Sequence, residues 1–464
     1  MSRDTIKELK PKVGLITTIA PGDHWPEEIV NKAKLTHNKV KDKLISLGFD
    51  VYEYQDLIRD YSEMRKAGKE LRYKGIEVLV IYVYTWTYSS NSIAAALETE
   101  VPVVIWADAT LGNAGITGGA VVKGGMDEVG IYSNLIYGAI DDPETLNELR
   151  IYCIAGSTAS RLKGQVLGVF GGRCMGMVTA EVDPNQWKIN FGIDIDEFEQ
   201  LEVIERAKNI PEDEATKFLV WMRNTFGKIE AKDEVMLAQI KLYLALKNII
   251  AEKKYDFIAV KCLPELPSIY TTFCLAHAFL NSKFDFYGSK EPFVMACEAD
   301  LNGALTMQIL KHISHQAVMF TDITYYNCNE NLLTLCNCGS HPIDHAPTLK
   351  DIWWLKEGIR EFKWLIGGTC PQFVAKEGIV TMSRLSRIKG KYAMLIVTGE
   401  AISQPRERLK ETVWERPHAF IRPNSTPQKF IKSIRSNHIH IVYGDYSQEL
   451  EEVCKILGIE PIVV

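Results

Sequence analysis

Two acidic residues interrupt strongly apolar segments in the second half of the chain. Glu298 follows the segment PFVMAC, and Asp322 lies inside AVMFTDITYYN. A carboxylate at the carboxyl end of a buried parallel strand lies where α/β proteins bind ligands. The helical stretch LNGALTMQILKHI separates the two acids by one crossover, so both could reach one cleft. Each also has a simpler interpretation: Glu298 as a solvated acid before a helix capped by Asp300, and Asp322 as a turn residue.

A pair of histidines near the C-terminus offers a third polar group. His438 and His440 alternate in SNHIHIVYGDY, so on a strand both side chains face the same side. One imidazole with two carboxylates makes a hard site suited to Mn²⁺ or another divalent cation, whereas zinc more often recruits further His or Cys ligands. The ordinary alternative for either histidine is a core imidazole bonded to the backbone. We assign that alternative to His440 and keep His438 as the candidate ligand.

The composition limits the class of protein. A chain of 464 residues is too long for one hydrophobic core, and its net charge of −6 argues against nucleic acid as a partner. The polar N-terminus lacks the apolar core of a signal peptide, and no apolar run is long enough to span a membrane, so we expect a cytoplasmic protein. The ten scattered cysteines are then reduced and mostly buried, and the spacing of Cys336 and Cys338 does not favour a metal site.

The elements that must position these residues form three groups. Continuous apolar strands such as EVLVIYVYT and VPVVIWA alternate with helical stretches, which indicates a doubly wound parallel sheet over residues 1–161. The same pattern recurs from GQVLGVFGG onward and predicts a second α/β domain over residues 162–315. Close-spaced strands with few intervening helices then predict a mainly β, barrel-like domain over residues 316–464.

Several separated motifs together resemble the L-fucose isomerase family. They are CEADLNGALTM, an acid twenty-four residues beyond Glu298, and NHIHIVYGD near the C-terminus. PKVGLITT resembles the family's first strand, YTWTYSS its Trp-x-Tyr segment, and GGRCMGM the strand end that opens its second domain. The resemblance extends over nearly the whole chain.

The resemblance implies an assembly and a set of site residues. The family's subunit has two α/β domains and a C-terminal β domain, and it usually forms a hexamer. By this similarity Glu298, Asp322 and His438 bind Mn²⁺, and the two acids also transfer protons. Asn437 would contact the sugar, and Trp86 would be offered to the site of a neighbouring subunit.

Aldose–ketose isomerisation also fits these residue types directly. The reaction moves a proton between C1 and C2 of a sugar through a cis-enediol. A divalent cation stabilises the developing negative charge, and a carboxylate within hydrogen-bond reach takes and returns the proton. The chain has no GxxxxGK[ST] segment and no complete GxGxxG after a strand, so no nucleotide cofactor is expected.

The sequence departs from the family at two places that bear on the substrate. The loop TIAPGDHWPEE carries Asp23, His24 and Trp25 where L-fucose isomerases have arginines that touch the sugar. Conversely, Arg173 in GGRCMGM stands where typical members have a small apolar residue; it is either a surface arginine or a clamp for an anionic group. Ser340 in CNCGSHP is either a sugar contact or a turn residue.

These departures make the substrate a separate question from the reaction. Relatives that isomerise the sulfonated sugar sulfoquinovose belong to the same broad family, so we expect a monosaccharide with an anionic tail. A neutral sugar such as L-fucose or D-arabinose is the alternative. A sugar-binding protein on the same scaffold is a further alternative, although it would not need both acids.

Overall fold

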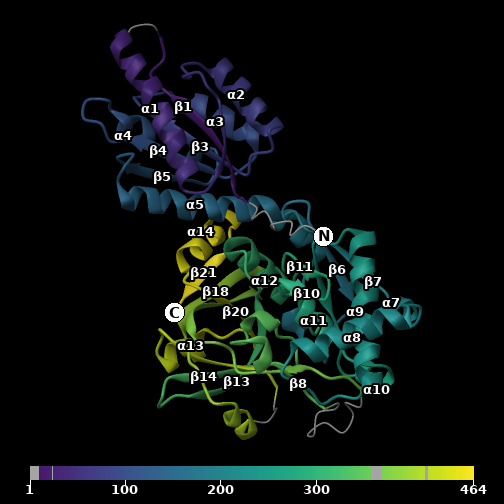
Figure 1. Cartoon of the computed structure of the whole chain (residues 1–464). Helices are drawn as coiled ribbons and strands as arrows, with labels where there is room; N and C mark the ends of the chain where they lie inside the picture. The colour runs from purple at the N-terminus through teal and green to yellow at the C-terminus, as the bar shows by residue number, and fades with distance from the viewer. Residues whose placement is uncertain (1–9, 23–24, 357–366, 413–415) are drawn as a thin grey trace. The chain divides into compact units, whose positions relative to one another are not determined.

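The computed structural model describes residues 10–22, 25–356, 367–412 and 416–464. These residues form two compact units, each described by itself below. The N-terminal unit is the described part of residues 7–163 together with 448–458, and the main unit comprises residues 164–447 and 459–464. Many of the elements of both are labelled in Figure 1.

The N-terminal unit is built on a five-stranded sheet in the order β2-β1-β3-β4-β5. Its strands, which all pair in parallel, are β1 (Lys12–Thr18), β2 (Asp50–Glu53), β3 (Val78–Val83), β4 (Val103–Asp108) and β5 (Ser133–Gly138). Its helices are α1 (Glu27–Ser46), α2 (Tyr61–Tyr73), α3 (Ser89–Thr99), α4 (Gly115–Glu128), α5 (Pro143–Leu162) and α14 (Ser447–Leu457). Every residue of β3 and β4 is buried, as the continuous apolar runs predict for a parallel sheet with both faces covered.

The main unit begins with a second parallel sheet in the order β12-β9-β6-β7. Its strands are β6 (Val166–Phe170), β7 (Asp194–Phe198), β9 (Phe257–Val260) and β12 (Met295–Cys297). The helices of this part are η1 (Val178–Ala180, a 3₁₀ turn), α6 (Pro184–Phe191), α7 (Gln200–Lys208), α8 (Glu212–Thr225), α9 (Asp233–Lys253), α10 (Leu266–Ile269), α11 (Cys274–Leu280) and α12 (Leu301–Ser314). Glu298 directly follows β12, at the carboxyl edge where such sheets bind ligands.

A seven-stranded sheet in the order β17-β20-β13-β14-β19-β18-β21 dominates the rest of the main unit. The strands are β13 (Met319–Asn327), β14 (Leu332–Cys336), β17 (Gly378–Ile388), β18 (Lys391–Ala401), β19 (His418–Pro423), β20 (His438–Tyr443) and β21 (Glu460–Val463). All pairings are antiparallel except that of β18 with β21, and β17 pairs with β18 as well as with β20. The register of β13 on β20 sets Asp322 directly opposite His438.

Smaller elements complete the main unit. They are the three-stranded sheet of β8 (Lys228–Ile229), β15 (Trp353–Trp354) and β16 (Pro371–Gln372), the hairpin of β10 (Phe284–Asp285) and β11 (Gly288–Ser289), the 3₁₀ turns η2 (Ile343–His345), η3 (Leu349–Asp351) and η4 (Arg406–Glu411), and α13 (Pro427–Ser433).

The predicted fold class is confirmed at the level of a mixed α/β protein with parallel sheets and a separate sheet-rich C-terminal region. One apolar cluster of the main unit includes Met295 from the parallel sheet and Met319 from the antiparallel sheet, so the two sheets share a core. Among the described helices, none is both long and apolar enough to cross a membrane. The ten cysteines are free thiols, and Cys328 and Cys338 are the two that are not buried.

Candidate metal and active site

Glu298 lies in the turn between β12 and α12, and its backbone conformation is unusual. Glu298 has a φ of 59° and Ala299 a φ of 47°, so two consecutive non-glycine residues are left-handed. This conformation is strained for residues with a side chain and recurs at functional sites. Asp300 then caps α12, because its Oδ1 accepts a hydrogen bond from the Gly303 amide at 2.9 Å. Glu298 is only 5% exposed, so its interpretation as a solvated acid is wrong.

The structure brings together the three residues selected from the sequence as metal ligands. The Nε2 atom of His438 lies 3.3 Å from Oε2 of Glu298 and 3.4 Å from Oδ1 of Asp322. One ligand atom from each residue lies within 4.8 Å of the others. Asp322 and His438 come from paired positions of β13 and β20, while Glu298 comes from the edge of the parallel sheet.

The orphaned ring nitrogen of His438 tests whether a cation fits this group. Nε2 is buried and has no hydrogen-bond partner among the described residues, although two carboxylates face it. A buried polar atom without a partner is costly, and a divalent cation would satisfy it together with the carboxylate oxygens. The donor set therefore fits a hard or borderline divalent ion such as Mn²⁺.

The other ring nitrogen of His438 is held by a network that the sequence analysis missed. Nδ1 donates to Oδ2 of Asp300 at 2.6 Å, and Asp300 is in turn paired with both terminal nitrogens of the buried Arg384. A carboxylate on the remote nitrogen of a ligand histidine fixes its tautomer and ring orientation. The sequence predicts Asp300 only as a helix cap. Its position two residues after Glu298 was the feature that could have indicated a place in the site.

The electrostatics of the group favour a positive charge at its centre. Burial and the charge of Glu298 raise the pKa of Asp322 to about 6, although His438 and two amide donors oppose the shift. Burial disfavours the charged ring of His438, but Asp300, Glu298 and Asp322 outweigh it and raise the pKa to about 10. Burial opposes the charge of Asp300, yet Arg384 and His438 hold its pKa well below the usual range. Without a metal, the proton on His438 serves as the cation among these carboxylates.

Two asparagines hold the carboxylates in place. Nδ2 of Asn337 donates to Oδ2 of Asp322 at 2.9 Å and lies 3.4 Å from Oε1 of Glu298. Nδ2 of Asn437 donates to Oδ1 of Asp322 at 2.8 Å. Asn437 was predicted as a sugar contact, and the structure places its amide on the ligand acid. Asn337 was missed, because it lies between two cysteines that the sequence analysis considered only as a metal pair.

The remaining predicted site residues have different surroundings. Ser340 lies near Asn337, whose Oδ1 accepts from its amide at 3.3 Å, and its buried hydroxyl lacks a partner within the described ranges. Arg173 is exposed and pairs with Glu181 at 3.3 Å. Trp86 belongs to the N-terminal unit, is 38% exposed and packs edge-on against a neighbouring tyrosine ring.

Two further sequence interpretations concern the first loop and the second histidine of the C-terminal pair. In the first loop, Asp23 and His24 lie outside the described residues. His440 is fully buried, and its Nε2 lies 3.4 Å from a terminal nitrogen of Arg384.

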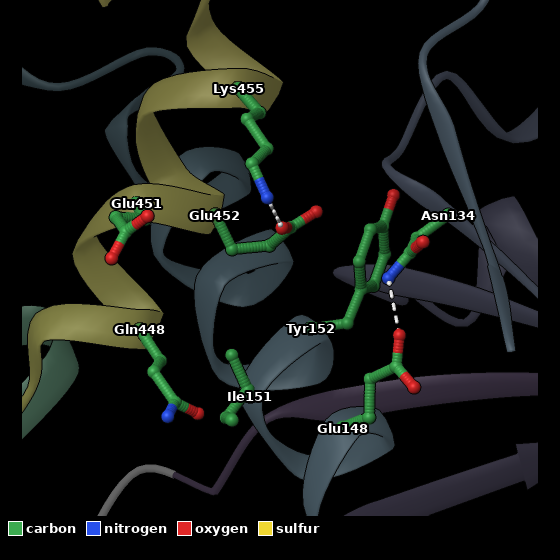
Figure 2. Close-up of a pocket in the computed structure, with 8 residues that line it drawn as sticks. All are labelled: Asn134, Glu148, Ile151, Tyr152, Gln448, Glu451, Glu452 and Lys455. Carbon is green, nitrogen blue, oxygen red and sulfur yellow. Dashed lines mark hydrogen bonds and ion pairs between the residues drawn. The ribbon is translucent and has the colours of Figure 1, made fainter. Parts of the chain in front are cut away.

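A separate pocket of about 270 Å³ lies in the N-terminal unit and is drawn in Figure 2. It is bordered by α5 and α14, and its polar residues include Glu148, which accepts from Asn134 at 3.3 Å, and Glu452, which pairs with Lys455 at 3.0 Å. None of the sequence-selected site residues lines it.

Comparisons with known proteins bear on this site. Residues 335–463 match the family model for the C-terminal domain of L-fucose isomerase. A sulfoquinovose isomerase of Alkalicoccus urumqiensis is 22% identical over 394 residues, which are 83% of this chain and 85% of that protein. A sulfoquinovose isomerase of Clostridium sp. is 22% identical over 70% of each chain, and an L-fucose isomerase of Vibrio vulnificus is 27% identical over 40% of each.

These similarities confirm the resemblance drawn from the motifs. The C-terminal part of the chain is similar to the corresponding domain of L-fucose isomerase, and the structure has two parallel sheets, a sheet-rich C-terminal region and a carboxylate–histidine group in the main unit. The chain is similar over most of its length to a sulfoquinovose isomerase, and over a shorter part to an L-fucose isomerase.

Proposed function

We propose that this protein is a metal-dependent isomerase that interconverts an aldose and a ketose. The observation that carries the proposal is the convergence of Glu298 and Asp322 on the orphaned Nε2 of His438. The names of the similar proteins support the same reaction class. A protein that only binds sugar has no need for two carboxylates and an imidazole gathered at one buried point.

Mn²⁺ is the cation we propose for Glu298, Asp322 and His438. Carboxylate oxygens suit Mn²⁺, and imidazole completes a set that other divalent ions also accept. When bound, the ion would stabilise the negative charge that develops on the sugar oxygens. Asp300 orients His438 so that Nε2 faces the site, and Arg384 keeps Asp300 charged.

The carboxylates of Glu298 and Asp322 carry the proton in the proposed reaction. One takes the proton from C2 of the aldose while the other, in its acid form, gives a proton to the carbonyl oxygen at C1, which gives a cis-enediol. The first returns its proton to C1 while the second takes the proton from the hydroxyl at C2, which gives the ketose and restores both groups. The proton on carbon is thereby transferred between neighbouring atoms, which needs a base within hydrogen-bond reach of both. Asn337 and Asn437 hold the Asp322 carboxylate in a fixed orientation.

We propose an aldose with an anionic group, such as a 6-sulfonated sugar, as the substrate. Arg173 supplies a guanidinium that can bind a sulfonate or carboxylate in two-point fashion. Its partner Glu181 is itself 46% exposed, so this ion pair can open at little cost when an anion arrives. Ser340 has a free buried hydroxyl for the sugar, and a neutral aldose remains the alternative substrate.

The assembly is proposed on the same resemblance. We propose a cytoplasmic homohexamer in which Trp86 of one subunit contacts sugar in the site of another. Within each subunit, residues 1–161, 162–315 and 316–464 are proposed as three domains, the last of them barrel-like. The pairing of β17 with both β18 and β20 supports that last description.

A panel of neutral and anionic aldoses tests the reaction and its substrate together. Each sugar is incubated with the Mn²⁺-loaded protein, and the ketose is identified by NMR. Proton transfer through a cis-enediol predicts that deuterium from heavy water appears on C1 of the ketose. Faster turnover of the anionic aldoses supports the substrate proposal, and equal turnover contradicts it. No ketose from any aldose contradicts the function itself.

A further inference from the structure

A second group of potential metal ligands also includes Glu298. One carboxylate oxygen of Glu298 and the Sγ atoms of Cys297 and Cys338 all lie within 4.8 Å of one another. We propose that these three residues form a second cation site, selective for a soft divalent ion such as Zn²⁺ or Cd²⁺, that shares Glu298 with the carboxylate–histidine site. The sharing makes such an ion an inhibitor.

The two cysteines are brought together by different elements. Cys297 is the last residue of β12, and Cys338 follows β14. Cys297 is buried, whereas Cys338 is partly exposed, which gives an ion in solution a route to the pair. The Sγ atom of Cys338 lies 3.6 Å from Oδ1 of Asn337, the residue whose amide group also faces Glu298. The pair therefore lies directly beside the carboxylates.

Other thiols nearby have backbone hydrogen-bond partners. The Sγ atoms of Cys174, Cys274 and Cys336 each donate to a backbone carbonyl, at 3.2, 3.6 and 3.8 Å. Among the described residues, the Sγ atoms that group with a Glu298 carboxylate oxygen are those of Cys297 and Cys338. This proximity to Glu298 distinguishes the proposed ligands from the other cysteines of the main unit.

The geometry and the ligand types select a soft ion. Tetrahedral zinc has Zn–S distances of about 2.3 Å, which places neighbouring ligand atoms roughly 3.5–3.8 Å apart. The three ligand atoms lie within 4.8 Å, so side-chain shifts of about 1 Å close the site. Thiolates select Zn²⁺ and related soft ions over Mn²⁺. Binding replaces the two thiol protons, which leave to solvent, and involves no oxidation.

Sharing of Glu298 couples the two sites. A carboxylate drawn toward a soft ion between the cysteines is withdrawn from His438 and Asp322. Because Glu298 is only 5% exposed, its side chain has little room to move between two ions. We expect a soft ion to weaken Mn²⁺ binding, and this consequence rests on the proposed function of the first site. The existence of the thiolate site does not rest on it.

Cadmium titration of the full-length protein tests the thiolate site directly. Cd²⁺ is added to the Mn²⁺-loaded protein with exposed Cys328 replaced by serine, and the ultraviolet thiolate-to-cadmium absorption is followed. We expect one saturating step in the parent protein. The affinity for Cd²⁺ should fall by about 10–100-fold or more in Cys338→Ser and in Cys297→Ser, because the loss of an outer-shell partner alone has an effect of that size. Cys336→Ser, which changes the buried cysteine that ends β14 two residues before Cys338, is the matched control and keeps the step.

Each outcome of this titration decides the proposal. No saturable absorption in the parent protein overturns it, as does an equal step in Cys338→Ser, and equal weakening by Cys336→Ser overturns the ligand assignment. If a variant does not fold, alkylation of the parent protein replaces the titration of that variant. Cd²⁺ should then protect Cys338 from iodoacetamide, and equal labelling with and without Cd²⁺ contradicts the site. Mn²⁺ release, followed by electron paramagnetic resonance, reports the coupling separately from activity; retained Mn²⁺ overturns the sharing of Glu298.

Discussion

The Asp300 carboxylate lies 2.6 Å from Nδ1 of His438, and this contact decides which ring nitrogen faces the candidate metal site. With Nδ1 occupied, Nε2 is the atom directed toward Glu298 and Asp322. Arg384 completes the chain of contacts by pairing with the same carboxylate from β17. One buried acid thus caps a helix, neutralises an arginine and orients the His438 ring.

Substitution of Asp300 by asparagine separates these roles. Asparagine is an equally good helix cap, so α12 keeps its start, but a neutral amide is a weaker partner for His438 and leaves Arg384 with an uncompensated charge. We expect Mn²⁺ affinity to fall by about 10–100-fold, the usual effect of losing an outer-shell partner. Calorimetry with Mn²⁺ measures it.

The matched control for this variant is Asp142→Asn, which changes another capping aspartate at the start of α5 in the N-terminal unit. It leaves Mn²⁺ affinity at the parent value. Unchanged affinity in Asp300→Asn, with the fold intact by circular dichroism, would show that the hydrogen bond to His438 plays no part in binding the ion.

Removal of the Asn337 amide affects the acids it holds. Its hydrogen bond lowers the pKa of Asp322, so Asn337→Ala raises that pKa further above its ordinary value. We expect slower turnover, and an acid limb of the pH–rate profile that moves to higher pH. The control is Asn424→Ala, which removes an exposed asparagine whose amide donates a hydrogen bond to a threonine hydroxyl. A profile of Asn337→Ala that superimposes on the parent contradicts this role.

Metal binding is expected to release protons in a pH-dependent manner. In the metal-free protein the pKa of His438 is raised to about 10, so its ring is protonated at pH 7 and must lose one proton to bind an ion. The pKa of Asp322 is raised to about 6, so at pH 5 a second proton is displaced and affinity is lower. Calorimetry in buffers of different ionisation enthalpy counts these protons. Binding at pH 7 without proton release would place His438 outside the ligand set.

Arg173→Ala tests recognition of an anionic substrate. Loss of a charge-assisted hydrogen bond costs about 1.5–3 kcal/mol, which corresponds to at least about a tenfold rise in KM for an anionic aldose. The KM for a neutral aldose stays unchanged. Arg223→Ala, which removes another exposed arginine from an ion pair with Asp233, leaves both values at the parent level. An equal effect of Arg173→Ala on neutral and anionic sugars rules out the clamp.

The fold class and two of the three central residues could be predicted from local patterns, whereas His438 depended more on the resemblance of NHIHIVYGD to the family. Continuous apolar runs marked β3 and β4, and Asp300 was correctly read as the cap of α12. Polar residues at the ends of apolar segments marked Glu298 and Asp322, because an acid beside a buried strand end needs a partner or a ligand.

The supporting contacts could not be predicted in the same way. Arg384 lies on β17 and reaches Asp300 only because α12 packs against that strand, which no local spacing encodes. Asn337 meets Asp322 through the pairing of β13 with β14. Spacing along the chain could indicate only cysteines that are close in sequence, whereas Cys338, which follows β14, lies beside Cys297 at the end of β12. Trp86 was selected by resemblance for a neighbouring subunit, which a single chain does not test.

The rate of ketose formation after chelation and metal restoration tests the central claim most directly. The parent protein should lose activity on chelation and regain it with Mn²⁺. Glu298→Gln should stay about 10²–10⁴-fold slower after restoration, because a proton-transfer carboxylate and ligand is gone. Glu291→Gln, an exposed acid before β12, should recover fully. Ketose formation that persists without metal, or full activity in Glu298→Gln, would contradict the account.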